Sequence, residues 1–404
     1  MKKIPTLFIL LTLAATLSAQ TYPFIQYKEN QLLYADRSEN LAKFFDRWER
    51  MEATGLGNIN IVHIGGSHVQ AGTMSNAIRQ RLMHSHPHLV GGRGLLFPYA
   101  AAARCNNPAD YRVHCPQKVA LTRNIYKEYP QPLGLCGISV TASDSLTEVG
   151  IVLRDSTVDY ATTRIIVLGH SNQGVEPLLN LGGCTIRPSY VDHSTDRHVF
   201  NLDHPVDSFV VLLPCRTGEQ FTLTGIHLDN LRSGFSFHSV GVNGAAVPDY
   251  LRCEHFCCDL RLLRPDMVIF GLGINDASKS DFDTADFRRN YLALVDSILR
   301  VNPDCALVFI TNNDSYTKVS RKKYKVNAKG ELAREVFHRL ACETGGVVWD
   351  QFQLMGGLGS MEQWQKAKLA QTDRVHFTRA GYQLLGDLFY NALTDAHQKH
   401  SSKK

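Results

Sequence analysis

The first ninety residues alternate between helical and strand-like patterns of apolar positions. Between residues 38 and 54 apolar side chains recur at the spacing of an amphipathic helix, at Leu41, Phe44, Phe45, Trp48 and Met51. A short apolar run from Ile61 to Ile64, with His63 within it, follows and has a length typical of a buried strand. Helical spacing then returns at Met74, Ile78 and Leu82. Residues 20–90 are therefore predicted to form the first part of an α/β domain.

Between residues 91 and 234 the pattern changes to short, β-like runs. The clearest of them are residues 137–140, 148–153, 164–168, 208–213 and 221–228, with Pro, Asn, Asp and Gly between them. No long helical period interrupts this region. Such spacing of strands and turn residues predicts a β-sandwich inserted into the α/β domain.

The α/β rhythm resumes from residue 235 to residue 404. The predicted strands are 237–242, 266–270, 306–311 and 346–349, and the predicted helices are 248–263, 284–301, 331–343 and 378–397. Strands that alternate with helices of this length need crossover connections. We therefore expect a parallel sheet that is covered by helices on both faces.

The segment Met1–Ala19 has the layout of a secretory signal. Lys2 and Lys3 precede an apolar run from Ile4 to Ala15, and small residues stand ahead of Gln20. The run is shorter than the roughly 18 apolar residues of a membrane span. We expect an exported protein, periplasmic or secreted, with no stable membrane insertion. No cysteine directly follows the predicted cleavage point, so a lipid anchor is not expected.

The charge and the cysteines of the chain bear on whether it binds nucleic acid, forms disulfides or holds a metal. A formal charge of +5 with scattered basic residues is too mild for a nucleic-acid-binding protein. Ten cysteines in an exported chain permit disulfides, whose pairing the sequence leaves open. Cys253, Cys257 and Cys258 lack the spacing of zinc ligands, and on a helix the first two would share a buried face. Neither a metal nor an organic cofactor is expected.

A serine follows the first predicted strand after two glycines. Gly65 and Gly66 allow the chain to turn sharply there, so Ser67 would stand at the edge where open α/β sheets bind their ligands. One interpretation is that Ser67 is a catalytic nucleophile. The other is that it only caps the following helix, as serines often do.

Three further stretches place polar groups or a glycine just after a predicted strand or just ahead of the last predicted helix. Gly244, after the strand 237–242, could present its backbone N–H to a substrate oxygen, and Asn275, after the strand 266–270, could present its side-chain amide. With the Ser67 N–H these groups would form an oxyanion hole. Ahead of the last helix, His376 could take the proton of Ser67 while Asp373 orients the imidazole. Alone, each residue could equally be an ordinary turn or cap residue.

In this order along the chain, the four blocks resemble those of the SGNH (GDSL-type) hydrolase superfamily, whose members hydrolyse esters. The resemblance implies a flavodoxin-like, three-layer α/β/α fold with Ser67 as nucleophile, His376 as base and Asp373 as acid. It also makes Gly244 and Asn275 oxyanion donors. The usual GDS reads GGS here. Because the missing aspartate mainly supports the loop, Gly66 is expected to affect loop rigidity and rate more than reaction type.

The β region lies between the serine and glycine blocks, and with the GGSH sequence it resembles the jelly-roll-like, carbohydrate-binding module of exported peptidoglycan O-acetylesterases. The resemblance implies a serine esterase that removes O-acetyl groups from a polysaccharide, most simply a cell-wall glycan. Alternatives are an O-acetyltransferase, a plant-glycan acetylesterase, or a catalytically decayed glycan-binding protein. His68 and Gln70 would either bind substrate or support the turn. The β region is expected to serve polymer recognition and not chemistry.

Overall fold

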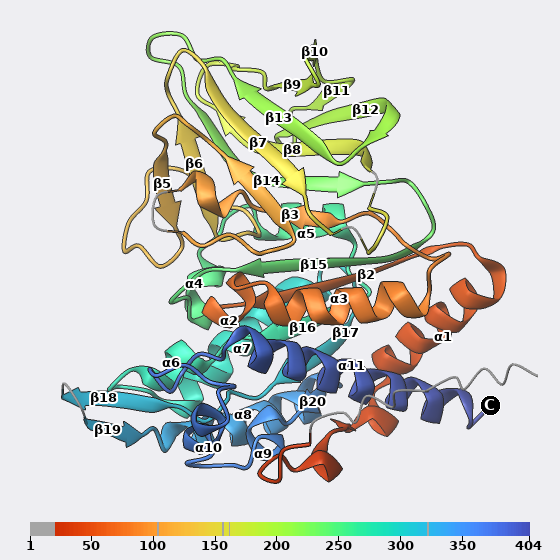
Figure 1. The fold of residues 1–404 in the computed structure, drawn as a ribbon, viewed down its shortest axis with the longest axis vertical. Helices are drawn as coiled ribbons and strands as arrows, with labels where there is room; N and C mark the ends of the chain where they lie inside the picture. The colour runs from red at the N-terminus through yellow and green to blue at the C-terminus, as the bar shows by residue number, and fades with distance from the viewer. Residues whose placement is uncertain (1–20, 103–104, 156, 161, 321–322) are drawn as a thin grey trace, which may run out of the picture.

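A computed structural model describes residues 21–102, 105–155, 157–160, 162–320 and 323–404 of the chain. The predicted signal segment, Met1–Ala19, lies outside these residues, and export stays a prediction. Two parts are visible in Figure 1: an α/β part that holds both ends of the described chain, and a β part stacked on one side of it. Among the described residues no helix is long and apolar enough to cross a membrane.

The α/β part is built on a six-stranded sheet. Its spatial order is β1 (Leu32–Leu33), β20 (Val347–Trp349), β17 (Ala306–Ile310), β16 (Met267–Gly271), β2 (Asn58–Gly65) and β15 (Gly234–Gly241). All neighbouring strands are parallel except β1, which pairs antiparallel with β20 at the edge. Numbered along the chain, the parallel strands stand in the order 2-1-3-4-5 of the flavodoxin-like fold. The predicted fold class is confirmed.

Helices cover both faces of this sheet. On one face lie α1 (Glu39–Thr54), α3 (Thr73–Ser85) and α11 (Arg379–Ser401), and on the other α4 (Val247–Leu251), α5 (Phe256–Leu263), α7 (Thr284–Leu299) and α8 (Lys329–Thr344). Successive residues of a strand point to opposite faces. In β2, Ile61 packs with the first group of helices, whereas Val62 and Ile64 pack with the second.

Short elements complete the α/β part. They are α2 (Ser67–Gln70), α6 (Ile274–Ser278), α9 (Gln351–Leu354), α10 (Met361–Lys366), the hairpin of β18 (Tyr316–Ser320) and β19 (Lys323–Val326), and the single 3-10 turns Tyr27–Glu29, Ala35–Arg37 and Tyr99–Ala101. Helix α2 comes directly after strand β2, and helix α6 comes directly after strand β16.

The β part consists of two antiparallel sheets formed by residues 94–229. One contains β10 (Cys184–Ile186), β9 (Leu178–Leu181), β13 (Ser208–Leu213), β7 (Thr147–Leu153) and β4 (Tyr111–His114). The other contains β11 (Tyr190–Asp192), β12 (Arg197–Val206), β8 (Thr162–Ser171), β14 (Phe221–Asp229), β6 (Ile138–Ala142) and β5 (Ala120–Arg123), with β3 (Gly94–Leu96) paired to β14. We call residues 94–229 the β insert. The exact domain boundaries, 90/91 and 234/235, stay predictions.

A buried ion cluster joins the β insert to α3. Asp110, just before β4, accepts hydrogen bonds from Arg79 of α3 at 3.1 Å and from Arg93 at 2.6 Å. The three side chains are between 1% and 3% exposed. Burial alone would raise the pKa of Asp110, but the two guanidinium groups hold it below its usual value. The carboxylate therefore stays charged and is the shared partner of two buried cations.

The single helix predicted for residues 248–263 is wrong. The chain forms α4 and α5 instead, and the segment between them contacts the β insert: the N–H of His255 donates to the Leu133 carbonyl, and Glu254 accepts from the Leu133 N–H. These contacts break the helix, so Cys253 lies buried in the turn and shares no helical face with Cys257. All ten cysteines are unpaired, and the described residues contain no cluster of potential metal ligands.

Candidate active site

Three neighbouring strands of the sheet end at the same level, each on a glycine. Gly65 of β2 is paired with Gly241 of β15 on one side and with Gly271 of β16 on the other. The segments that follow these strands therefore meet at one edge of the sheet, beside the point where the strand order reverses. This is where open α/β sheets bind ligands.

Ser67 is the first residue of α2, a single helical turn directly after β2. A Cβ atom on Gly65 would lie 2.2 Å from Val69 Cγ2 and 2.9 Å from the Gly271 carbonyl, so only glycine fits at this turn. The next helix, α3, begins at Thr73 after Gly72, which has a positive φ of 73°. Ser67 therefore does not cap α3.

The structure brings Ser67, His376 and Asp373 into one hydrogen-bonded chain. Ser67 Oγ lies 2.8 Å from His376 Nε2, and His376 Nδ1 lies 2.8 Å from Asp373 Oδ2. With its Nδ1 proton donated to Asp373, the imidazole can accept the serine proton at Nε2. This is the arrangement of a nucleophile, a general base and an orienting carboxylate.

Local backbone contacts hold the carboxylate in place. Asp373 Oδ1 accepts hydrogen bonds from the N–H groups of Val375 at 2.9 Å and His376 at 3.0 Å. Burial alone would raise the pKa of Asp373, but these bonds and the one from the His376 ring lower it to about 2. The carboxylate is therefore ionised throughout the neutral range. Asn313, which follows β17, donates to the Val375 carbonyl at 3.0 Å and anchors the loop.

Gly244 and Asn275 lie on the same cleft as Ser67. Gly244 has a positive φ of 88°, which favours glycine. Asn275 Nδ2 donates to the Ala245 carbonyl at 2.9 Å, and because an amide has two N–H donors, the second is left for a ligand. Asp276 accepts from the Val247 N–H at 3.2 Å, so the two loops with the predicted donors are tied together.

His68 and Gln70 make support contacts around this site. His68 Nδ1 lies 2.8 Å from the Tyr382 hydroxyl, and its ring lies 5.1 Å from the His376 ring. Burial lowers the pKa of His68 to about 3, so its ring is neutral. Gln70 is buried, and its Oε1 accepts from the Asn243 N–H at 2.7 Å. These contacts favour the structural interpretation for His68, whereas Gln70 also lines the cleft.

The cleft has a volume of about 630 Å³, and six of the thirteen residues that line it have amide side chains. Besides the residues above, its walls include Asn106, Asn107 and Gln371. The two asparagines belong to the β insert, and sequence reasoning missed them. No signal in the sequence marks them, since they reach the cleft only because the β insert docks against the α/β part.

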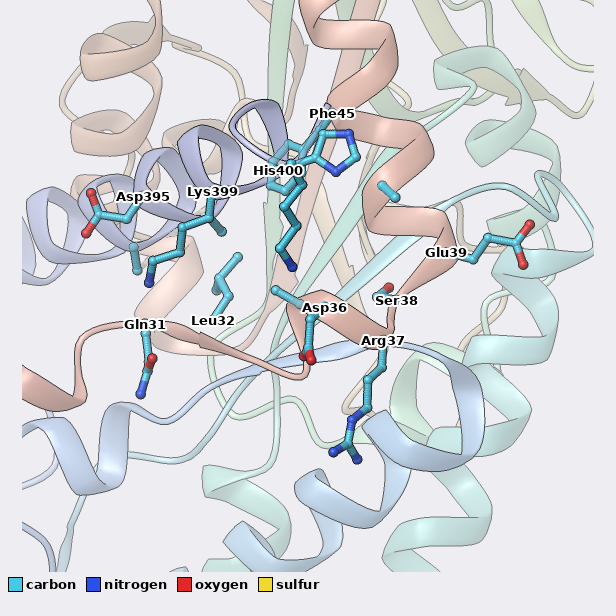
Figure 2. A pocket seen from close by; sticks show the side chains of 15 residues that line it. Gln31, Leu32, Asp36, Arg37, Ser38, Glu39, Phe45, Asp395, Lys399 and His400 are labelled. Atoms are coloured by element: carbon cyan, nitrogen blue, oxygen red, sulfur yellow. The ribbon is translucent and has the colours of Figure 1, made fainter.

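A second groove, of about 510 Å³, lies between the 3-10 turn Ala35–Arg37, the start of α1 and the end of α11 (Figure 2). It contains a serine and a histidine, but they do not form a catalytic pair. Ser38 donates to the Gly345 carbonyl, and His400 bonds to Asp46. The hydrogen-bonded Ser–His–Asp geometry is therefore found in the cleft at Ser67 and not in this groove.

Residues 205–384 match the family described as "GDSL-like Lipase/Acylhydrolase". The matched stretch contains Gly244, Asn275, Asp373 and His376. Ser67 lies ahead of it, on the other side of most of the β insert. No curated protein matches the sequence.

Solved structures extend the comparison. A peptidoglycan O-acetylesterase, 19% identical, is matched over 90% of this chain and 97% of its own, with a TM-score of 0.74. An acetyl xylan esterase from Geobacillus stearothermophilus, 23% identical, is matched over 40% of this chain and 73% of its own, with a TM-score of 0.29. The first likeness extends over so much of the chain that it includes the β insert as well as the α/β part. It concerns the fold.

Proposed function

We propose that this protein, an SGNH (GDSL-like) hydrolase by its fold and its family match, removes O-acetyl groups from a carbohydrate polymer through an acyl-serine intermediate. The observation that carries the proposal is the hydrogen-bonded chain from Ser67 through His376 to Asp373 at the end of β2. A protein that only bound glycans would have no need of a serine placed within reach of an oriented imidazole.

In the first half-reaction, Ser67 Oγ attacks the acetyl carbonyl carbon while His376 Nε2 takes the hydroxyl proton. Negative charge develops on the carbonyl oxygen, which the N–H groups of Ser67 and Gly244 and the free amide hydrogen of Asn275 would hold. The C–O bond to the sugar then breaks, and the imidazolium returns its proton to the leaving sugar oxygen. Acetyl-Ser67 remains.

In the second half-reaction, water replaces the sugar. His376 removes a proton from the water as the oxygen attacks acetyl-Ser67, and the same donors hold the second oxyanion. The bond to Ser67 Oγ breaks, the serine recovers its proton from His376, and acetate leaves. Asp373 keeps one imidazole tautomer and stabilises the imidazolium in both halves. These steps need only groups of this chain and water.

We propose a cell-wall glycan such as peptidoglycan as the substrate. The support is the likeness in fold to a peptidoglycan O-acetylesterase over 90% of this chain, together with six amide side chains in the cleft, which suit sugar hydroxyls. The secretory layout of Met1–Ala19 supports export to the compartment of such a substrate. Acetyl transfer to a second sugar shares the acyl-serine step, and no contact in the cleft favours it.

The test is acetate release from O-acetylated peptidoglycan and from O-acetylated xylan by the same purified protein. We expect faster release from peptidoglycan and no release by Ser67→Ala from either polymer. Preference for xylan would move the substrate to plant glycans. Acetate release that persists in a folded Ser67→Ala variant would contradict the acyl-serine mechanism.

A further inference from the structure

The peptide unit between Asn243 and Gly244 carries one of the proposed oxyanion donors. Its N–H belongs to Gly244 and its carbonyl to Asn243. In a trans peptide these two groups point in opposite directions. Whatever binds the Asn243 carbonyl therefore sets the direction of the Gly244 N–H from behind. In this structure the group that binds it is the Arg123 guanidinium, whose Nη2 donates to the carbonyl.

Arg123 comes from the β insert, as the last residue of β5. Its side chain is partly buried, and its Nε is buried without a partner. Among the described residues no carboxylate forms a salt bridge with Arg123. Its positive charge is therefore not neutralised by an acidic side chain. Hydrogen bonds from a charged donor are stronger than neutral ones. A guanidinium on the carbonyl also draws electrons from the amide and makes its N–H a better donor.

Side-chain packing holds Gly244 only weakly, and one backbone hydrogen bond, from the Ala245 N–H to the Val242 carbonyl at 2.9 Å, closes the turn around it. With a φ of 88° and no side chain, a Cβ there would have only Ile125 Cδ1 within 4 Å, at 3.7 Å. Hydrogen bonds must therefore fix the orientation of the peptide. On its N-terminal side, Gln70 Oε1 accepts from the Asn243 N–H at 2.7 Å. Gln70 lies one turn after Ser67 on α2, so the donor loop is held by the nucleophile's helix and by the β insert together.

We propose that Arg123 is a positioning residue for catalysis, which orients and polarises the Gly244 N–H toward the oxyanion. The inference rests on the proposed function and deepens it, because it gives the β insert a part in chemistry. It differs from the expectation that the insert serves recognition alone, which stays a prediction. Removing the insert would then remove a support of the oxyanion hole as well as a wall of the cleft.

Kinetics with a small ester, 4-nitrophenyl acetate, test the catalytic role without any polymer contact. Loss of a whole oxyanion donor lowers kcat by about 10²–10³. Arg123→Met leaves the donor in place but unsupported, so we expect kcat to fall by about tenfold or more with KM changed less than about twofold. Arg123→Lys keeps a cationic donor and should recover most of the loss.

Arg252 supplies a matched control. It is also an arginine that joins the two parts through carbonyl oxygens, those of Asn124, Tyr126 and Lys127, but it does not touch the Asn243–Gly244 peptide. Arg252→Met should disturb docking of the β insert without lowering kcat by the same factor. Equal losses in the Arg123 and Arg252 variants would reduce Arg123 to a docking contact and overturn the proposal.

A second readout does not depend on activity. Asn followed by Gly occurs once in the chain, at residues 243–244. Protein labelled with carbonyl-¹³C asparagine and ¹⁵N glycine therefore gives one HNCO cross-peak, from this peptide. Arg123→Met should shift that peak, Arg123→Lys should shift it less, and Arg252→Met should leave it nearly in place. An unmoved peak in Arg123→Met would overturn the proposal.

The two readouts separate this inference from the proposed function. A parent protein that releases no acetate from any ester would overturn the proposed function and the catalytic role of Arg123 together, even if the peak moves. An active parent whose kcat is unchanged in Arg123→Met would overturn the inference alone. Reduced kcat, recovery with lysine and a shifted peak would establish it.

Discussion

Replacing Gly66 by aspartate would restore the usual GDS sequence, and we expect it to lower activity in this chain. A Cβ on Gly66 would lie 3.1 Å from Asn275 Nδ2, tighter than ordinary van der Waals contact, and 3.4 Å from the Ala245 carbonyl. Gly66 has a negative φ of −94°, so the backbone itself would not be strained. The strain falls on the amide of Asn275, which we propose as an oxyanion donor.

The size of the effect follows from that contact. The Asn275 amide must move by a few tenths of an ångström to admit a methyl group, and loss of one oxyanion donor lowers kcat by about 10²–10³. We expect Gly66→Ala to lower kcat by less than this limit. We expect Gly66→Asp to approach it, because a carboxylate beside Asn275 competes for the donor and repels the developing oxyanion.

The assay is kcat and KM for 4-nitrophenyl acetate, with circular dichroism and thermal unfolding to verify the fold. Gly150→Ala in the β insert is the control, because a Cβ there would meet no atom closer than 3.5 Å and the site lies away from the cleft. It should leave kcat unchanged. A folded Gly66→Asp variant with kcat at or above that of the parent would refute the reasoning.

Three further predictions follow from the site and the ion cluster. Ser67→Ala should lower kcat by several orders of magnitude in a folded protein, measured by acetate release, and near-normal turnover would remove Ser67 from the mechanism. Because its hydrogen bonds lower the pKa of Asp373 to about 2, the group stabilises the fold above its unfolded pKa of about 4 and loses this effect as pH falls through 2. Asp373→Asn should therefore show a shallower fall of the urea midpoint between pH 4 and pH 2, and an unchanged slope would contradict this. Asp110→Ala leaves the buried guanidinium groups of Arg79 and Arg93 without their carboxylate partner. It should lower the free energy of unfolding by about 3–5 kcal/mol in urea titrations. Glu176→Ala, which breaks an exposed ion pair of the same β insert, should change it by less than about 1 kcal/mol, and equal effects would be inconsistent with a buried cluster.

Much of the fold could be predicted because its signals are local. The apolar spacing over residues 38–54 predicts a helix, and α1 covers Glu39–Thr54. The short apolar run before Gly65 predicts a strand, and β2 lies there. The order of strands and helices then implies a parallel sheet, so residues after strand ends are expected to meet. This order predicts that Ser67, Gly244 and Asn275 lie close together, and the three residues line one cleft.

What could not be predicted depends on contacts between distant segments. Helical spacing over residues 248–263 is continuous, but contacts with Leu133 break the helix after Leu251. Arg123 carries no mark in the sequence, since its role requires the end of β5 to lie behind Gly244. The crowding between Gly66 and Asn275 is likewise invisible before the two loops are placed. In each case the deciding neighbour lies more than a hundred positions away.

The serine and its base are 309 positions apart in the chain. Because the chain is synthesised from its N-terminus, Ser67 leaves the ribosome long before His376. His376 stands just ahead of α11, and α11 packs along α3, the helix that follows the nucleophile's turn. When α11 docks on α3, it therefore also brings His376 to Ser67. On the proposed mechanism, a chain in which α11 has not yet docked carries a serine without its base, and esterase activity begins only once α11 is in place.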